Sequence, residues 1–165
     1  MKSQDRNKSD IIQAEAVISV GIARARQWFM ELEAHPERYV FETHAGFVFT
    51  EGDFGQVGAR FATRERFYGV RFSLGFELID VDERRFEFRV IRPSLPIRGA
   101  FSLQEVDVNN TKLCLEIEAA DRAGRWILGL PGIREAIERQ IRGEAAHIKA
   151  SMEATWGDGP SRHPG

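Results

Sequence analysis

Two kinds of hydrophobic periodicity divide the chain. The β-branched residues of 11–20 predict a first strand, and apolar residues at helical spacing in 23–33 predict a helix after it. His35 precedes a proline, which pushes it out of the α region and ends this helix. Pro36 can then open a second short helix that runs to Tyr39. The chain is therefore expected to start with a strand and two short helices.

From residue 43 to residue 118 the period changes to two. Apolar and charged side chains alternate, so that Phe86 and Phe88 face one way while Arg85 and Glu87 face the other. Turns between these segments are expected at 51–55, 80–84 and 109–110. The pattern predicts an antiparallel meander with one apolar face and one solvated face.

The last long segment supplies a cover for the apolar face of this sheet. It starts at Pro131 and can run to about Trp156, as one amphipathic helix. Its apolar stripe consists of Ile133, Ile137, Ile141, Ile148 and Met152. We therefore predict an α+β fold in which a curved antiparallel sheet of about seven strands wraps around a long C-terminal helix.

This order of elements resembles the START-related SRPBCC superfamily. That group includes pollen-allergen-like proteins, polyketide cyclases/dehydrases and coenzyme Q-binding proteins. The similar stretches are 18–29, 35–39, 56–61, 101–103 and 110–113. The resemblance covers roughly residues 10–155 and implies the helix-grip fold, in which the sheet and the long helix enclose a cavity for a hydrophobic ligand. The superfamily has no universal catalytic residue, so no catalytic residue is carried over and none is assigned.

Length and composition agree with one domain of ordinary globular type. The chain has 165 residues, of which 42% are hydrophobic and 29% charged. We predict a single START/SRPBCC-like domain at 10–157. The polar stretches 1–9 and 158–165 have no apolar anchors and are predicted to be disordered tails.

Several classes of protein and site are not supported by the sequence. The net charge of −2 gives no electrostatic case for nucleic acid, and no stretch approaches the roughly 20 apolar residues of a membrane span. The polar N-terminus does not resemble a signal peptide, and the single Cys114 excludes an internal disulfide. We therefore expect a cytoplasmic protein. The histidines are not spaced as metal ligands, and the glycine-rich stretch 52–58 is typical of a hairpin turn, so neither metal nor cofactor is expected.

Glu144 interrupts the apolar stripe of the predicted last helix. At about 100° per residue it falls inside the stripe, and His147 lies along one border. A carboxylate at such a position is costly unless it is hydrated, paired or protonated. One interpretation is a polar group that faces a ligand cavity. The other is a slight rotation of the helix, which brings Glu144 to solvent or to a strand arginine.

Residues of the strands complete the candidate cavity. Glu65 shares the phase of Phe61, and Arg92 shares the phase of Phe88, so both can point inward unless a bulge resets the phase. The candidate lining residues are Glu144, His147, Glu65, Arg92, Phe61, Phe76, Phe88, Phe101, Ile141 and Ile148. The 12 phenylalanines can equally fill an ordinary core.

A short apolar segment at 126–130 lies between Arg122 and Arg134. Apolar residues in a connecting segment can form a lid at a cavity mouth or a transient lipid contact, and Trp with Arg suits such an interface. Trp126 and Leu128 are the lid candidates. The alternative is an early helical turn packed on the sheet.

Two function classes follow. The first is binding or transfer of a small hydrophobic ligand, such as a lipid, an isoprenoid or an aromatic or polyketide-like compound. The second is a cyclase/dehydrase-like enzyme acting on a polyketide or related carbonyl compound. Glu144 or His147 would then be the acid/base, and Arg92 or Tyr68 would polarise the carbonyl. We favour binding, because catalysis needs converging polar groups and these candidates are scattered. A regulator that acts through protein contacts on the outer face of the sheet is a weaker alternative.

Overall fold

The computed structural model describes residues 11–42 and 44–156, so both predicted tails lie outside the described residues. The strands are β1 (Ile11–Ile18), β2 (His44–Glu51), β3 (Arg60–Phe67), β4 (Val70–Val81), β5 (Arg85–Arg92), β6 (Ile97–Asp107) and β7 (Asn110–Ala119). The helices are α1 (Ile22–Met30), the 3-10 helix η2 (Pro36–Tyr39), α2 (Arg122–Leu128) and α3 (Ile133–Trp156). The order of elements matches the prediction, with α2 added before the long helix.

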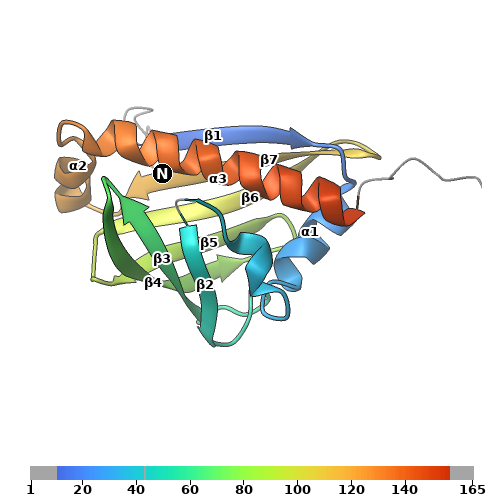
Figure 1. The fold of residues 1–165 in the computed structure, drawn as a ribbon, viewed down its shortest axis with the longest axis horizontal. Helices are drawn as coiled ribbons and strands as arrows, with labels where there is room; N and C mark the ends of the chain where they lie inside the picture. The colour runs from blue at the N-terminus through green and yellow to red at the C-terminus, as the bar shows by residue number, and fades with distance from the viewer. Residues whose placement is uncertain (1–10, 43, 157–165) are drawn as a thin grey trace, which may run out of the picture.

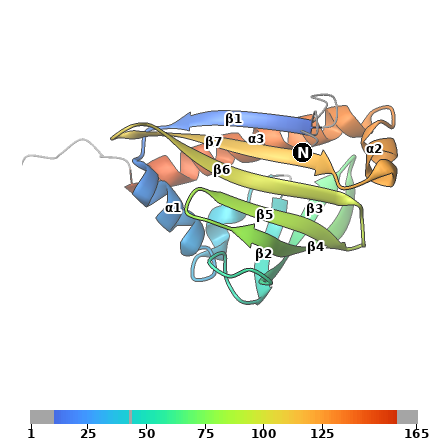
Figure 2. The same ribbon diagram turned by 180° about the vertical axis from the view of Figure 1, so that it is seen from behind.

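All strand pairs of the sheet are antiparallel, in the order β1-β7-β6-β5-β4-β3-β2. Consecutive strands from β2 to β7 form hairpins, and β1 pairs with the last strand. The helix α3 crosses one face of the curved sheet (Figure 1), and the described helices leave the other face open (Figure 2). The predicted α+β fold, with a curved sheet wrapped around a long C-terminal helix, is confirmed.

An aromatic cluster fills the core at the α1 end of the molecule. Trp28 and Phe29 of α1 are fully buried, and the ring of Phe29 lies 5.2 Å from that of Phe86 and 5.7 Å from that of Phe54. Trp28 Nε1 donates a hydrogen bond of 3.1 Å to Ser151 Oγ near the end of α3. This contact ties α1 to the C-terminal half of α3, so little space remains there.

The turn before β3 shifts the start of that strand. Alternation in the sequence suggests that Val57 shares the inner face with Phe61, but Val57 is exposed and β3 begins at Arg60. Gly58 has a φ of 88°, a left-handed conformation that breaks the extended backbone and that glycine adopts without strain. The glycine-rich stretch is thus a turn between two strands, as predicted.

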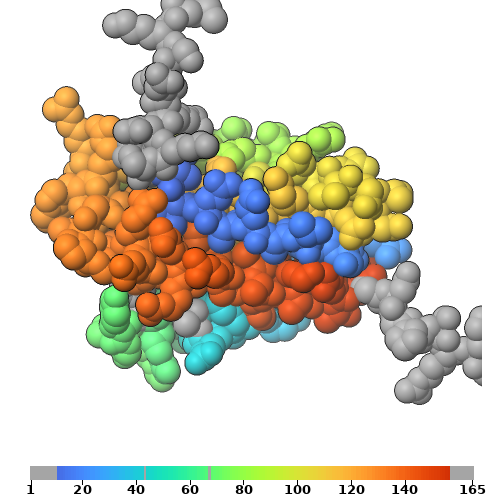
Figure 3. Space-filling view, turned by 90° about the horizontal axis from the view of Figure 1, so that it is seen from above, coloured from blue at the N-terminus to red at the C-terminus, as the bar shows by residue number. Residues whose placement is uncertain are grey.

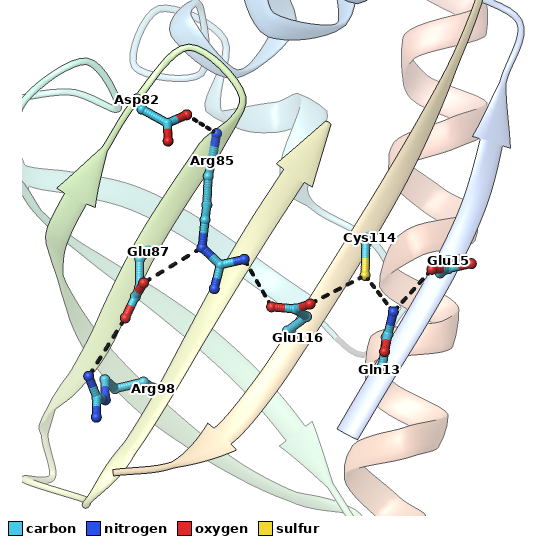
Figure 4. Close-up of polar contacts among 8 residues, drawn as sticks. All are labelled: Gln13, Glu15, Asp82, Arg85, Glu87, Arg98, Cys114 and Glu116. Atoms are coloured by element: carbon cyan, nitrogen blue, oxygen red, sulfur yellow. Dashed lines mark hydrogen bonds and ion pairs between the residues drawn. The ribbon is translucent and has the colours of Figure 1, made fainter. Parts of the chain in front are cut away.

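Charged side chains hold the outer face of the sheet together (Figure 4). Arg85 donates to Glu116 over 2.9 Å and lies 3.6 Å from Glu87, whose other oxygen is 3.8 Å from Arg98. The contacts of Arg85 with Glu116 and of Glu87 with Arg98 join different strands, and cross-strand pairs contribute roughly 0.2–1 kcal/mol each and oppose a slip of register. No described helix is both long and apolar enough to cross a membrane.

Candidate functional site

A cavity of about 270 Å³ lies between the sheet and the N-terminal half of α3. Its wall is mainly aliphatic and aromatic. The predicted residues Phe61, Phe76, Phe88, Phe101 and Ile141 are all part of this wall. The volume is at the lower end of the range for small-molecule sites, which indicates a small ligand.

The cavity opens beside the β3–β4 hairpin. Among its lining residues, Arg66 and Phe72 are exposed, and both belong to this hairpin. Tyr68 at the hairpin tip is also exposed, and its hydroxyl donates a 3.3 Å hydrogen bond to the carbonyl oxygen of Gly132, just before α3. Figure 3 shows the hairpin (green, lower left) against the start of α3. Tyr68 therefore lies at the rim of the cavity. A residue that polarises a ligand carbonyl would have to lie on the cavity wall, and Tyr68 does not.

Glu144 brings a carboxyl group to the cavity wall from α3. Its Oε1 accepts a hydrogen bond from the hydroxyl of Tyr39, which η2 places against α3. The side chain is partly accessible because it borders the cavity, yet its carboxyl group is surrounded by protein. This burial raises the pKa of Glu144 to about 8, so the carboxyl is mainly protonated at neutral pH.

A second carboxyl group, that of Glu65, faces the same cavity from β3. Its Oε1 lies 3.1 Å from His44 Nε2, and its Oε2 accepts a 3.0 Å hydrogen bond from Gln140 Nε2. Burial raises the pKa of Glu65 to about 7, against a smaller lowering by Thr63, and burial lowers the pKa of His44 to about 4. Because burial disfavours both charged forms, we describe this contact as a neutral acid beside a neutral imidazole rather than as an ion pair.

Two buried polar side chains at this end of the cavity lack a hydrogen-bond partner among the described residues. Thr63 is 3% exposed, and its Oγ1 lies near the Glu65 carboxyl without forming a hydrogen bond of normal geometry. Neither ring nitrogen of His44 has a well-aligned partner. Buried polar atoms are almost always satisfied in native proteins, so these unsatisfied atoms mark a place where a ligand or water fits.

His147 does not line the cavity. Its Nε2 lies 2.8 Å from the carbonyl oxygen of Arg38, and its ring stacks on Phe41 at a centroid distance of 4.7 Å. His147 lies about 60° from Glu144 around the helix axis, and its ring reaches Arg38 and Phe41, on either side of Tyr39, instead of the cavity. A role as the cavity's acid or base is therefore not supported.

Arg92 is also absent from the cavity wall, and a β-bulge explains why. Gly75 pairs with Arg92 while Phe76 pairs with Val90, so β5 carries one extra residue at this point. The extra residue reverses the phase of the strand and places Arg92, which is exposed, on the opposite face from Val90.

Ile148 is fully buried but lies beyond the cavity. The lining residues of α3 extend from Ile133 to Glu144 only. The C-terminal half of the helix packs against the α1 end, where Trp28 and its neighbours fill the space. The predicted stripe is thus divided into a cavity half and a core half.

Residues 126–128 of the segment predicted as a lid form the last turn of the helix α2. Asp121 caps it, since its side chain accepts a 2.9 Å hydrogen bond from the amide of Gly124. Leu128 is buried, Ile127 lines the cavity, and Trp126 is 69% exposed. Neither lid candidate lines the cavity, and the residue between them does.

Exposure of Trp126 gives a simple expected result. Trp126→Ala should change the free energy of unfolding by no more than about 0.5 kcal/mol, because the side chain buries little surface. Leu128→Ala on the same helix should cost roughly 2–4 kcal/mol, because Leu128 is 4% exposed. Urea unfolding followed by circular dichroism measures both, and a loss of several kcal/mol for Trp126→Ala would contradict the exposed position.

Sequence reasoning missed Tyr39 and His44 of the polar cluster, and it placed Gln140 on the border of the apolar stripe without counting it among the cavity candidates. Gln140 lies one helical turn before Glu144, and helical spacing places it beside that residue. Tyr39 and His44 lie at the ends of short elements, and only the tertiary fold brings them to α3 and β3. The described residues contain no group of three or more His, Cys, Asp or Glu that could hold a metal.

The comparisons with known proteins concern the fold. No protein-family model matches the chain, and no curated protein matches it in sequence. The structure is similar to that of the Zhui aromatase/cyclase from a Streptomyces species, with a TM-score of 0.67 and 12% identity over 90% of this chain and 97% of that chain. A START superfamily protein from Mycobacterium smegmatis gives a TM-score of 0.61 and 10% identity over 88% and 96% of the two chains.

A further similar structure is the di-domain ARO/CYC protein BexL from the BE-7585A biosynthetic pathway. It gives a TM-score of 0.65 and 16% identity over 89% of this chain and 47% of BexL, so the chain spans about half of that protein. At such low identity these likenesses establish the fold alone. The chain therefore shares the helix-grip fold of these aromatase/cyclase and START superfamily structures, the fold that the resemblance of its sequence implies.

Proposed function

We propose that this protein binds a small, largely hydrophobic molecule in the cavity between the sheet and α3. The observation that carries the proposal is the combination of an apolar wall with a single polar end, formed around Glu144 and Glu65. An apolar wall supplies binding free energy, and a few placed polar groups orient the ligand. The fold that this chain shares with START-like and aromatase/cyclase proteins supports this function.

A cavity-filling substitution tests the proposal. Purified protein is titrated with N-phenyl-1-naphthylamine, an uncharged probe whose fluorescence rises in apolar surroundings. Wild type is expected to bind it, and Leu74→Trp should bind it roughly tenfold more weakly, because Leu74 lines the cavity and an indole would occupy the space. Native mass spectrometry of the untreated protein, followed by solvent extraction, would identify any co-purifying molecule.

The matched control is Val48→Trp on β2. Val48 is exposed and does not line the cavity, so this variant should bind the probe as wild type does. Circular dichroism confirms that each variant is folded. Equal probe binding by folded Leu74→Trp, or no binding by wild type, would overturn the proposal.

A second candidate function is acid/base catalysis on a carbonyl compound. The observation that favours it is the convergence of two carboxyl groups, Glu144 and Glu65, on one apolar cavity, each with a pKa raised by burial. A carboxyl group whose pKa lies near the working pH can both donate and accept a proton. In this mechanism Glu144 is the acid/base. His147 and Arg92 are not needed, which agrees with their positions away from the cavity.

A further inference from the structure

The two carboxyl groups of the cavity differ in what they can offer a ligand. Both oxygens of Glu65 already face protein groups, because Oε1 lies beside His44 and Oε2 accepts from Gln140. Glu144 uses only Oε1, which accepts from Tyr39, and its Oε2 has no hydrogen-bond partner among the described residues. Glu144 is thus the carboxyl that can meet a bound molecule.

The charges around Glu144 determine which ligand group it can meet. No described Lys or Arg forms an ion pair with Glu144, and the titratable groups facing it are Tyr39 of η2, His44 of β2 and Glu65 of β3. Burial favours the neutral forms of Glu65 and His44. A protonated Glu144 is a hydrogen-bond donor, whereas an anionic ligand here would be buried without a cation.

The remaining charged and titratable groups lie at the mouth of the cavity or behind its wall, where His147 is close enough to lower the pKa of His44. Arg66, the cavity's one permanently charged cation among the described lining residues, belongs to the exposed hairpin at the mouth. His147, on the turn after Glu144, faces the carbonyl oxygen of Arg38. Thr63 adds a second polar atom at the inner end, since its buried Oγ1 has no partner among the described residues. Below about pH 7 the inner end therefore holds mainly neutral donors and acceptors.

We infer that the cavity selects an uncharged ligand that presents a carbonyl-type acceptor to Glu144, and that it rejects carboxylates of the same shape. This inference rests on the proposed function and adds the chemical class of the ligand. Glu144 is then a specificity-determining residue. The carbonyl oxygen accepts from Oε2 of Glu144, while the Tyr39 hydroxyl holds Oε1 in place.

Three isosteric naphthalenes test the inference by displacement of N-phenyl-1-naphthylamine. The ketone 2-acetylnaphthalene should bind roughly tenfold or more tightly than 2-naphthoate, which would bring an unpaired charge into the cavity. It should also bind more tightly than 2-ethylnaphthalene, which leaves Glu144 unsatisfied. Measurements at pH 6.5 on the wild-type protein alone are sufficient to test this order of affinities.

A pH series then assigns the selectivity to Glu144. Raising the pH from 6.5 to 9 removes the Glu144 proton, so the affinity of wild type for the ketone should fall about tenfold, while that for 2-ethylnaphthalene should change little. Glu144→Gln keeps an N–H donor that does not titrate, so its ketone affinity should fall much less than that of wild type over this pH range, in which Glu65 also titrates. Glu135→Gln, an exposed carboxyl on the first turn of α3, should behave as wild type.

The outcomes separate this inference from the proposed function. If N-phenyl-1-naphthylamine does not bind at all, the proposed function fails. If it binds and 2-naphthoate displaces it as well as the ketone does, the function stands and the selectivity is wrong. If Arg66→Gln then abolished the binding of 2-naphthoate, the ligand would be bound in the opposite orientation, with its carboxylate at Arg66 in the cavity mouth. That result also overturns the inference. A ketone affinity that falls as much with pH in Glu144→Gln as in wild type would assign the titration to another group, such as Glu65, and overturn the inference.

Discussion

Replacing Glu144 by Gln should stabilise the protein in alkaline solution. The gain in unfolding free energy over wild type is expected to be roughly 3–5 kcal/mol larger at pH 9 than at pH 4. The unfolded carboxyl has its ordinary pKa of 4.5, and burial raises the pKa of the folded one to about 8. Between these values the unfolded state has lost the proton that the folded state keeps, so wild-type stability falls as the pH rises. Above pH 8 both states are deprotonated, so the loss of stability caused by the buried charge is complete and no longer changes with pH.

The amide introduced by Glu144→Gln isolates the titration from other changes. Its size is that of a carboxyl, and its oxygen can still accept from Tyr39. Two other buried groups also titrate, in both proteins alike. Glu65, with a pKa near 7, lowers stability at higher pH, and His44, with a pKa near 4, lowers it as the pH falls from about 6.5 to 4. The difference between the two proteins therefore reports on position 144.

Urea unfolding at one-unit intervals from pH 4 to pH 9 measures the difference. Glu135→Gln is the control, because Glu135 is an exposed carboxyl on the same helix and does not line the cavity. Parallel stability curves for wild type and Glu144→Gln would show that Glu144 is ionised and solvated in the folded protein. The cavity would then lack its protonated donor.

The inner face of the sheet could be predicted from the sequence wherever the strands are regular. Alternation in β3 places Glu65 on the same face as Phe61, and the structure has both on the cavity side. The same reasoning failed for Arg92, because a bulge leaves no mark in a pattern of period two. Helical spacing placed Glu144 on the sheet-facing side of α3, and the structure has it there too. A long regular helix contains nothing like a β-bulge, so its residues keep their predicted phase.

The polar partners of Glu144 were beyond what the sequence could provide. Tyr39 comes from a four-residue 3-10 helix, whose orientation depends on how η2 packs against α3 and β2. The contact between His44 and Glu65 depends on the β2–β3 register, which has a shift just after His44. Hydrophobic patterns fix which face of an element is buried, but they do not fix which polar groups meet across two elements. The cavity was therefore predictable in outline, and its polar end was not.

Trp28→Ala should lower the free energy of unfolding by roughly 3–5 kcal/mol, the loss typical of a fully buried aromatic side chain. Trp28 is fully buried, and its ring lies 5.2 Å from that of Phe29 and 6.1 Å from that of Tyr39. The substitution removes these contacts and the hydrogen bond to Ser151 Oγ, so a cavity forms between α1 and α3. Urea unfolding at pH 6.5 measures the loss.

Two further substitutions separate the causes of that loss. Trp28→Phe keeps an aromatic ring and removes the hydrogen bond to Ser151, so it should cost less, about 1–2 kcal/mol. Met30→Ala, at an exposed position on the same helix, should cost less than about 1 kcal/mol. Equal losses for Trp28→Ala and Met30→Ala would contradict the packing of α1 against α3. Because Trp28 also contacts Tyr39, folded Trp28→Ala should bind 2-acetylnaphthalene more weakly, since the partner that holds Glu144 in place has lost its support.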